Sequence, residues 1–269
     1  MNDENYKQYK KTVKQIIDDK VNDDHFDEYI DKLGSEDVTG LMPTSFYRYR
    51  PFNEYTLSEI INQHIFLSPI DKLDDKLDSK YIYKPFGKHT AEEETIYNWR
   101  RPSSQKIIDE VNKEFAQHIR IACLTQDHKN MPMWNYYAQG HKGICIKYRT
   151  KDFNSDYIFL PVIYPSKRKK EGTFKFLPAD NQMKCGAVFN SIVKDESWKF
   201  EKEWRVIQYV DDDNNHYVDW NMSDIYLGCD ISDESVEIIK NIIIRNGLKI
   251  ALHKMNLSPI GLGSTDISI

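Results

Sequence analysis

The sequence contains few cysteines and no motif that pairs them. Its four cysteines lie at positions 123, 145, 185 and 229 of 269 residues, and no Cys-x-x-Cys occurs. A structural zinc site or a redox-active pair requires closely spaced cysteines, so neither is indicated. Scattered cysteines are typical of buried, reduced thiols, and we therefore expect a cytoplasmic protein.

Long apolar runs are absent as well. No stretch of about 18 apolar residues occurs, so we expect no transmembrane helix and no membrane partner. The polar start MNDENYKQYKK lacks the apolar region of a secretory signal. A formal net charge of -5 disfavours a general nucleic-acid coat, and a local basic patch stays open.

The common catalytic motifs are also missing. The chain has no G-x-S-x-G, no P-loop, no G-x-G-x-x-G and no H-E-x-x-H. Each of these motifs places a nucleophile, a phosphate or a metal by its spacing. Their absence excludes the common hydrolase, NTPase, Rossmann and zinc-protease interpretations.

Short β patterns that alternate with helical patterns are present instead. Period-two runs predict strands at 44–51, 64–69, 119–126, 144–148, 156–165, 198–209, 224–231 and 248–255. Helical spacing predicts helices within 1–33 and at 56–62 (capped by Thr56), 90–118 (interrupted by Pro102), 132–140 and 232–246. We predict an α+β fold with mixed, mostly antiparallel short-strand sheets and peripheral helices. Residues 1–43 form an N-terminal helical extension, and residues 44–269 form a single α+β domain.

The stretch SWKFEKEWRVIQ, residues 197–208, alternates aromatic and charged side chains. On a strand, one face carries Trp198, Phe200, Lys202, Trp204 and Val206. The opposite face carries Glu201, Glu203 and Arg205. The aromatic face requires a core, and the charged face is either ordinary solvent surface or the floor of a cleft.

Four segments together resemble a bacterial family. They are FYRYRP (46–51), IFLSPIDKLDDKLDS (65–79), MWNYYAQGHKGICIKY (133–148) and SWKFEKEWRVI (197–207), followed by DIYLGCDIS. In order and spacing they are similar to the bacterial domain-of-unknown-function family twenty-nine seventy-one, over residues 44–262. The acidic loop departs from that family's Asn-Asp-Pro-Phe-Asp, and the family implies no activity.

A second resemblance is to the ADP-ribosyltransferase fold. Those enzymes place an Arg or His on a first strand, a Ser or Tyr motif on a second, and a Glu-x-Glu, Gln-x-Glu or single Glu late in the chain. Arg48, Ser68 and Glu201-Lys202-Glu203 occur in that order, with 80–118 as an insertion. The resemblance implies an ADP-ribosyltransferase-like core and an enzyme that uses NAD.

Glu203 and Glu201 are the catalytic residues that this resemblance implies. Cleavage of nicotinamide from NAD develops an oxocarbenium-like charge, which a carboxylate bound to the ribose 2′-hydroxyl stabilises. Glu203 takes that role, and Glu201, about 7 Å away along a strand, orients or deprotonates the acceptor. The alternative is a solvated strand face on which both flank Arg205.

The residues predicted to contact NAD are Tyr47, Arg48, Ser68, Trp134, Tyr137 and Arg205. A guanidinium fork suits a diphosphate, which makes Arg48 the candidate for the dinucleotide. Structural alternatives stay open. The arginine pairs with a strand carboxylate such as Glu203, the serine caps a strand, and the two rings of segment 132–140 belong to the core.

Two charged segments have further interpretations. The acidic cluster Asp71, Asp74, Asp75 and Asp78 lacks the glycine and glutamate of an EF-hand, so no metal is predicted. A nuclease would need these carboxylates to converge with Glu203 on one metal ion. The basic run Lys167–Lys170, with Phe174 and Phe176, is either a contact for a protein or nucleic-acid acceptor or a solvated loop.

We therefore predict a cytoplasmic, NAD-using ADP-ribosyltransferase-like enzyme, of the kind that serves as a bacterial toxin or phage-defence effector. The alternative is a non-catalytic binding or regulatory module of a toxin–antitoxin or defence system, in which paired Glu and Arg hold the fold. Glu201 and Glu203 in a concave pocket near Arg48 indicate the enzyme. Full exposure of both on a flat sheet indicates the module.

Overall fold

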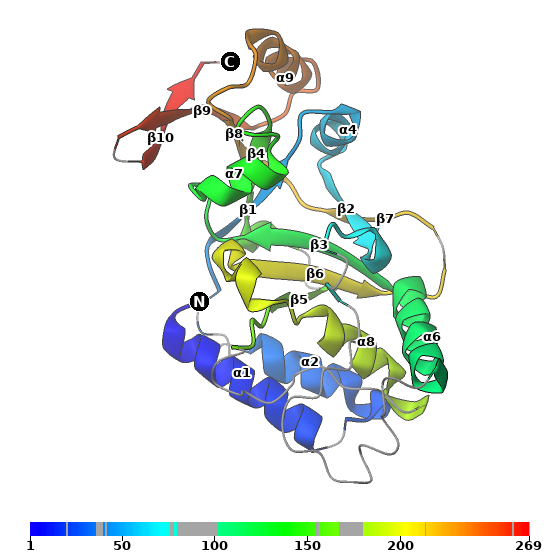
Figure 1. Cartoon of the computed structure of the whole chain (residues 1–269). Helices are drawn as coiled ribbons and strands as arrows, with labels where there is room; N and C mark the ends of the chain where they lie inside the picture. The colour runs from blue at the N-terminus through cyan, green and yellow to red at the C-terminus, as the bar shows by residue number, and fades with distance from the viewer. Residues whose placement is uncertain are drawn as a thin grey trace.

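Short strands and amphipathic helices alternate along the chain. The computed structural model describes residues 1–19, 21–35, 40, 42–75, 78–79, 102–153, 156–166, 180–212, 214–259 and 261–268. Within these ranges the fold is α+β with a mixed, mostly antiparallel sheet, which confirms the predicted fold class (Figure 1). None of the described helices is both long and apolar enough to cross a bilayer.

The elements follow the predicted order closely. The helices are α1 (Asp3–Asp18), α2 (Phe26–Gly34), α4 (Glu54–Asn62), α6 (Pro102–His118), α7 (Met131–Tyr137), α8 (Met183–Ser191) and α9 (Asp233–Arg245). The 3-10 turns are η1 (Asp23–His25), η2 (Ile70–Lys72), η3 (Thr150–Asp152), η4 (Asp180–Gln182) and η5 (Glu196–Glu201). The strands are β1 (Ser45–Arg50), β2 (His64–Pro69), β3 (Ile119–Thr125), β4 (Ile144–Arg149), β5 (Ile158–Pro161), β6 (Glu203–Tyr209), β7 (His216–Asp219), β8 (Met222–Leu227), β9 (Ala251–Ser258) and β10 (Gly261–Ile267). The sequence pattern did not indicate β7, which is short, or β10, which contains two glycines.

One helix start differs from the prediction. α4 begins at Glu54, because the Asn53 side chain accepts the backbone N–H of Thr56 and takes the capping role. α6 is described from Pro102 onwards. The prediction of helix over 90–101 falls outside the described residues.

The sheet splits between β1 and β3. The strand order is β10-β9-β8-β4-β1-β3-β2-β7, with β6 paired to β3 and β5 paired to β6, and among the described strands only β8 and β9 pair in parallel. β1 pairs with β4 from Ser45 to Arg50 but with β3 only at Tyr47, opposite Thr125. β3 pairs with β6 along its whole length instead. Beyond Tyr47 the two arms of the sheet therefore separate, and Arg48 and Arg50 face the opening.

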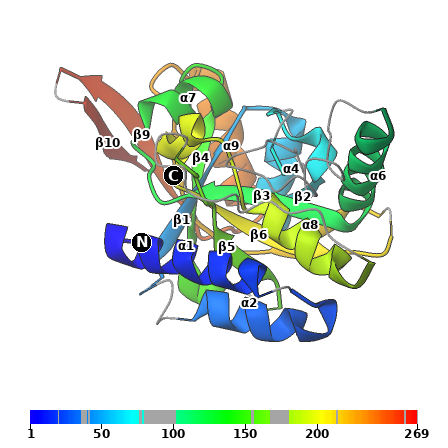
Figure 2. The same cartoon turned by 60° about the horizontal axis from the view of Figure 1, so that its bottom comes forward.

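The N-terminal helices dock on the β3–β6 arm. Tyr9, Val13 and Leu33 are fully buried in the same hydrophobic cluster as Ile121 of β3 and Ile207 of β6. Figure 2 shows α1 and α2 side by side on one side of the sheet. Burial of each such side chain stabilises the fold by about 1.5–3 kcal/mol, so these helices are part of the folded body.

Candidate functional site

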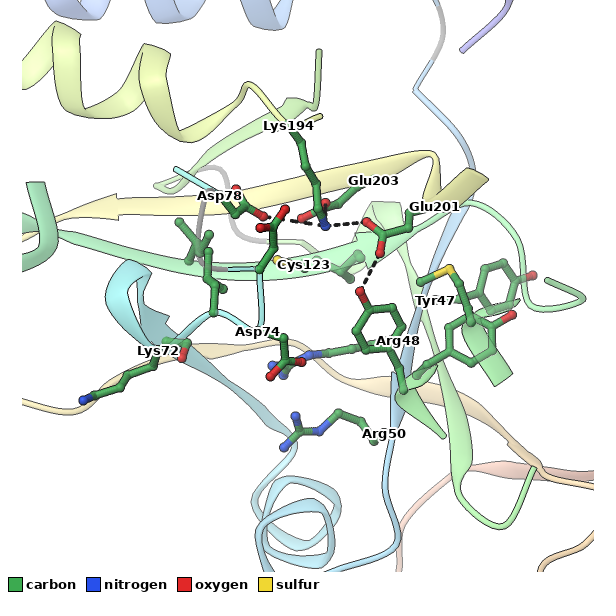
Figure 3. Close-up of a pocket in the computed structure, with 18 residues that line it drawn as sticks. Tyr47, Arg48, Arg50, Lys72, Asp74, Asp78, Cys123, Lys194, Glu201 and Glu203 are labelled. Atoms are coloured by element: carbon green, nitrogen blue, oxygen red, sulfur yellow. Dashed lines mark hydrogen bonds and ion pairs between the residues drawn. The ribbon is translucent and has the colours of Figure 1, made fainter. Parts of the chain in front are cut away.

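A cavity of about 300 Å³ opens where β1 separates from β3 (Figure 3). Its walls come from β1, the end of β2 with the turn after it, β3, α7 and the segment 194–203. Six of the predicted site residues line it together: Tyr47, Arg48, Ser68, Tyr137, Glu201 and Glu203. They come from segments far apart in the sequence, so the split in the sheet is what assembles them.

The backbone ahead of β6 differs from the predicted continuous strand over 198–209. η5 occupies this position, and Lys202 then takes a left-handed φ of 47°. The strand begins only at Glu203, so Trp198 and Phe200 do not continue the core face. The left-handed region is uncommon for residues other than glycine, and such residues cluster at functional sites.

Side-chain hydrogen bonds from other elements hold this turn. The Thr125 hydroxyl donates to the Glu201 carbonyl at 2.6 Å, and the Asn130 amide donates to the Phe200 carbonyl at 2.6 Å. Such bonds offer the backbone an alternative to a strand ladder. Because both donors lie some 70 residues upstream, with separations of 76 and 70, the local alternation carries no sign of the turn.

Arg205 is the centre of a buried ionic network. Its Nε donates to Glu203 Oε1 at 2.7 Å, and its Nη1 and Nη2 donate to Asp78 at 2.8 and 2.6 Å. Nη1 also donates to Ser79 Oγ at 2.9 Å and to the Ser191 carbonyl. Arg205 is 0% exposed, and a charge so buried is tolerated only when partners replace its water.

Lys194 extends the same network to Glu201. Its Nζ lies 2.5 Å from Glu201 Oε2, 3.0 Å from Glu203 Oε2 and 3.6 Å from Asp78 Oδ2. The Tyr137 hydroxyl donates to the other oxygen of Glu201 at 2.5 Å. We call Asp78, Lys194, Glu201, Glu203 and Arg205 the Arg205 network. It sets three carboxylates against two cations.

The two glutamates of the network titrate in opposite directions. Burial and the neighbouring Glu203 charge raise the pKa of Glu201 to about 7, although Lys194 and Tyr137 donate to it. Burial would also raise the pKa of Glu203, but the charges of Arg205 and Lys194 hold it well below its usual range. Paired carboxyl groups with separated pKa values are the arrangement that assigns one as the acid or base and the other as a fixed charge.

A second charged group, here called the Glu59 cluster, lies at another wall of the cavity. Arg48 Nη1 lies 2.9 Å from Glu59 Oε1, and Arg50 Nε lies 3.1 Å from Oε2. The backbone N–H of Phe66 also donates to Glu59. The sequence offered Glu203 as an alternative partner for one of these arginines, but the observed partner is Glu59. Two guanidinium groups share one carboxylate, which leaves an excess positive charge within the cluster, and Lys72, Asp74 and Asp75 also line the cavity.

Trp134 and Arg205 lie outside the cavity wall. Trp134 is 0% exposed, packs edge-on against Tyr49 and donates its indole N–H to the His128 carbonyl at 2.9 Å. Arg205 is buried behind Glu203. Neither side chain lines the cavity. Trp134 lies in the core, as the alternative interpretation of its segment had it, and the assignment of both residues as NAD contacts stays a prediction.

Sequence reasoning missed Lys194 and Glu59, and it gave Asp78 no partner. Lys194 follows the buried end of α8, and no pattern separates it from an exposed lysine. Glu59 lies on a helix where a polar face is ordinary, yet it is only 2% exposed. The one available signal for Glu59 was the pair of arginines on β1, which requires a carboxylate nearby.

The acidic cluster does not form a metal centre in the described part of the chain. Asp78 gives both oxygens to Arg205, and no group of three or more His, Cys, Asp or Glu side chains among the described residues is placed for a metal ion. The nuclease alternative, which needs these carboxylates to converge with Glu203 on one metal ion, therefore has no support among the described residues. The basic run Lys167–Lys170, with Phe174 and Phe176, lies outside the described residues.

Comparison with known families bears on one part of this site. Residues 133–206 match the model of the family Protein of unknown function (DUF2971). The resemblance to that family is therefore confirmed over this segment, which carries Tyr137, Lys194, Glu201 and Glu203. The Glu59 cluster, Ser68 and Asp78 lie outside it. No curated protein and no solved structure matches the chain, and the ADP-ribosyltransferase-like core stays a prediction.

Proposed function

We propose that the protein is an NAD-using enzyme that breaks the bond between nicotinamide and ribose and transfers ADP-ribose. One observation carries this proposal. Arg48, Ser68, Glu201 and Glu203, the residues in the order typical of that chemistry, line one cavity. A volume of about 300 Å³ lies at the small end of ligand sites, so we propose that it receives the nicotinamide–ribose half of NAD.

The separated titration of the two glutamates supports their division of roles. Glu203 stays ionised, and a fixed carboxylate stabilises the positive charge that grows on the ribose as nicotinamide leaves. Glu201, with a pKa of about 7, gains and loses a proton near neutral pH, as a general base for the acceptor must. Both bind one Lys194 ammonium, so the two carboxylates lie close enough to act on one ribose.

The excess positive charge of the Glu59 cluster supports the choice of an anionic substrate. Arg48 and Arg50 both line the cavity, and side chains of this kind hold phosphate groups through paired N–H donors. Tyr47 and Tyr137 line the same cavity. We propose that the diphosphate of NAD binds beside this cluster.

A macromolecular acceptor, protein or nucleic acid, would make the enzyme a toxin or phage-defence effector. The four cysteines are free thiols in the structure, in keeping with the cytoplasmic location that we propose. Water as acceptor would instead give an NAD hydrolase at the same site.

A non-catalytic module is the second candidate, and one observation favours it. Each oxygen of Glu203 is bound by Arg205 or Lys194, and Glu203 is only 4% exposed. A network closed in this way can serve to hold β6 against the Asp78 turn without any chemistry. On that view the cavity binds a partner or a small ligand and leaves it unchanged.

The deciding experiment is an NAD titration by calorimetry, followed by measurement of nicotinamide release over hours. Wild type is compared with Glu201→Gln and with Glu196→Gln, a control in the same 3-10 turn that does not line the cavity. We expect wild type and the control to bind NAD and release nicotinamide, and Glu201→Gln to bind but lose release. Absence of binding to wild type at millimolar NAD would refute the proposal, and binding without release by wild type would favour the module.

A further inference from the structure

Tyr137 and Glu201 both line the cavity, and the tyrosine hydroxyl is bonded to one oxygen of Glu201. Glu201 is only 2% exposed, and its two oxygens accept from Lys194 and from Tyr137, each at 2.5 Å (Figure 3). Tyr137 itself is half-buried at the end of α7 and lines the cavity. Because the Glu201 side chain is almost fully buried and both of its oxygens are already bonded, the Tyr137 hydroxyl offers a ligand a route to this carboxylate.

We propose that Tyr137 relays a proton between Glu201 and a hydroxyl group, of water or of an alcohol-bearing acceptor, in the cavity. The chemistry of this step rests on the proposed function. The hydrogen-bond switch that it requires belongs to the protein alone and is testable without any substrate. A hydroxyl both donates and accepts, so Tyr137 can turn from donor to acceptor towards Glu201.

The proton transfer balances without ionising the tyrosine. With Glu201 ionised, the hydroxyl donates to Oε1. As the acceptor O–H gives its proton to Tyr137 Oη, the proton already on Oη passes to Glu201. The negative charge moves to the acceptor oxygen, whose electron pair forms the bond to ribose C1′ while nicotinamide leaves with the C–N pair. One carboxylate and one pyridinium cation become one neutral acid and one neutral nicotinamide.

Of the two described side chains that donate to Glu201, Lys194 and Tyr137, only the tyrosine hydroxyl can also accept a hydrogen bond from a ligand. The charged and titratable side chains around it are Asp78, Cys123, Tyr137, Tyr164, Lys194, Glu203 and Arg205. Burial opposes the charge of Lys194, but its three carboxylates prevail and raise its pKa, so it keeps its proton. Burial and the Glu201 charge likewise raise the pKa of Tyr137, so the relay works as a neutral hydroxyl.

The first test titrates the protein alone. The Glu201 carboxyl is followed by carbon-13 NMR of labelled protein, with Glu201→Gln to assign it, in wild type, Tyr137→Phe and Tyr136→Phe. Tyr136 is the matched control, next in sequence and 68% exposed. Loss of the donor in Tyr137→Phe should move the Glu201 midpoint up by about one to two pH units, and Tyr136→Phe should not. In wild type the Tyr137 ring carbon that bears the hydroxyl should shift at the Glu201 midpoint. The proposal would be overturned if Tyr137→Phe left the Glu201 midpoint unchanged, or if the Tyr137 ring carbon of wild type did not shift at that midpoint.

The second test follows nicotinamide release against pH. Tyr137→Phe should lower kcat by about 100-fold with KM unchanged, because the proton path is lost and the binding walls remain. A variant that shifts the titration yet keeps wild-type kcat would refute the relay and leave Tyr137 as a hydrogen-bond donor only. Should wild type release no nicotinamide, the proposed function fails, and the coupled titration of the ring carbon still decides the inference.

Discussion

The Arg205 network and the Glu59 cluster occupy walls of the same cavity but leave opposite charges uncompensated. The network holds three carboxylates and two cations, and its arginine is 0% exposed. The Glu59 cluster holds two arginines and one carboxylate, with Arg48 and Arg50 side chains 11% and 23% exposed. The network can be balanced by a proton on Glu201, whereas the cluster sets two guanidinium groups against one carboxylate beside a cavity that Asp74 and Asp75 also line. The comparison therefore distinguishes the Arg205 network, which stabilises the fold, from the Glu59 cluster, which can bind a ligand.

The largest effect should follow from removal of Arg205. Arg205→Met leaves Asp78 and Glu203 buried without their main partner, and we expect the free energy of unfolding to fall by about 3–5 kcal/mol. Urea titration measures this change. Arg50→Met, at the partly exposed cluster, should cost much less. Equal losses at the two arginines would contradict the contrast between the walls.

The pH dependence of stability should show the raised pKa of Glu201. Folded Glu201 holds its proton more tightly than unfolded Glu201, so its stabilising contribution is full below about pH 4.5 and is lost as the pH rises through about 7. The shift corresponds to about 3 kcal/mol, which Glu201→Gln should remove. Glu203 acts in the opposite sense, because its contribution is present above its unfolded pKa and is lost as the pH falls through its lowered folded pKa. Parallel stability–pH curves for wild type and Glu201→Gln between pH 4.5 and 8 would rule out the raised pKa.

Substitutions in the Glu59 cluster should change the affinity for NAD more than they change the free energy of unfolding. Arg48→Gln and Arg50→Gln should each weaken NAD binding by about tenfold to hundredfold, because a charged hydrogen bond to the diphosphate is lost. Calorimetry measures the dissociation constant, and nicotinamide riboside, which lacks the diphosphate, serves as the control ligand. Equal loss for NAD and for the riboside would place the diphosphate elsewhere.

The smallest effect should follow from removal of an exposed ion pair whose N–O distance equals that of the buried Arg205–Asp78 pair. Lys14 Nζ lies 2.6 Å from Asp18, as Arg205 Nη2 lies 2.6 Å from Asp78, yet the α1 pair is 43% and 60% exposed. Lys14→Met should change the free energy of unfolding by less than about 0.5 kcal/mol in a thermal or urea melt. A loss near that of Arg205→Met would show that burial does not govern these pairs.

Hydrophobic periodicity predicted many of the helices and strands because it depends only on residues that are close together in the sequence. β1, β2, β3, β4 and α9 lie where the pattern placed them, since each buries one face against the body. The 198–209 strand was wrong over its first half. The side chains of Thr125 and Asn130, from another part of the chain, hold that turn by hydrogen bonds. No residue close to the turn in sequence indicates that it forms.

The candidate site was predicted in part for the same reason. Arg48, Ser68, Glu201 and Glu203 carry distinctive side chains at places that the pattern could assign to strands. Lys194 looks like any lysine at the end of a helix, and its partners become visible only when three segments meet. The fully buried Trp134 shows the converse, since an aromatic residue beside a site residue is not thereby part of the site.

The contact between Asp78 and Arg205 joins residues 127 positions apart. Closing so long a loop costs conformational entropy before the contacts that it allows can stabilise the fold. We therefore expect this contact to form late in folding. A chain that is still incomplete on the ribosome, or that has misfolded, then has no assembled cavity. If the protein has the NAD-consuming activity that we propose, late assembly would delay that activity until the molecule is finished.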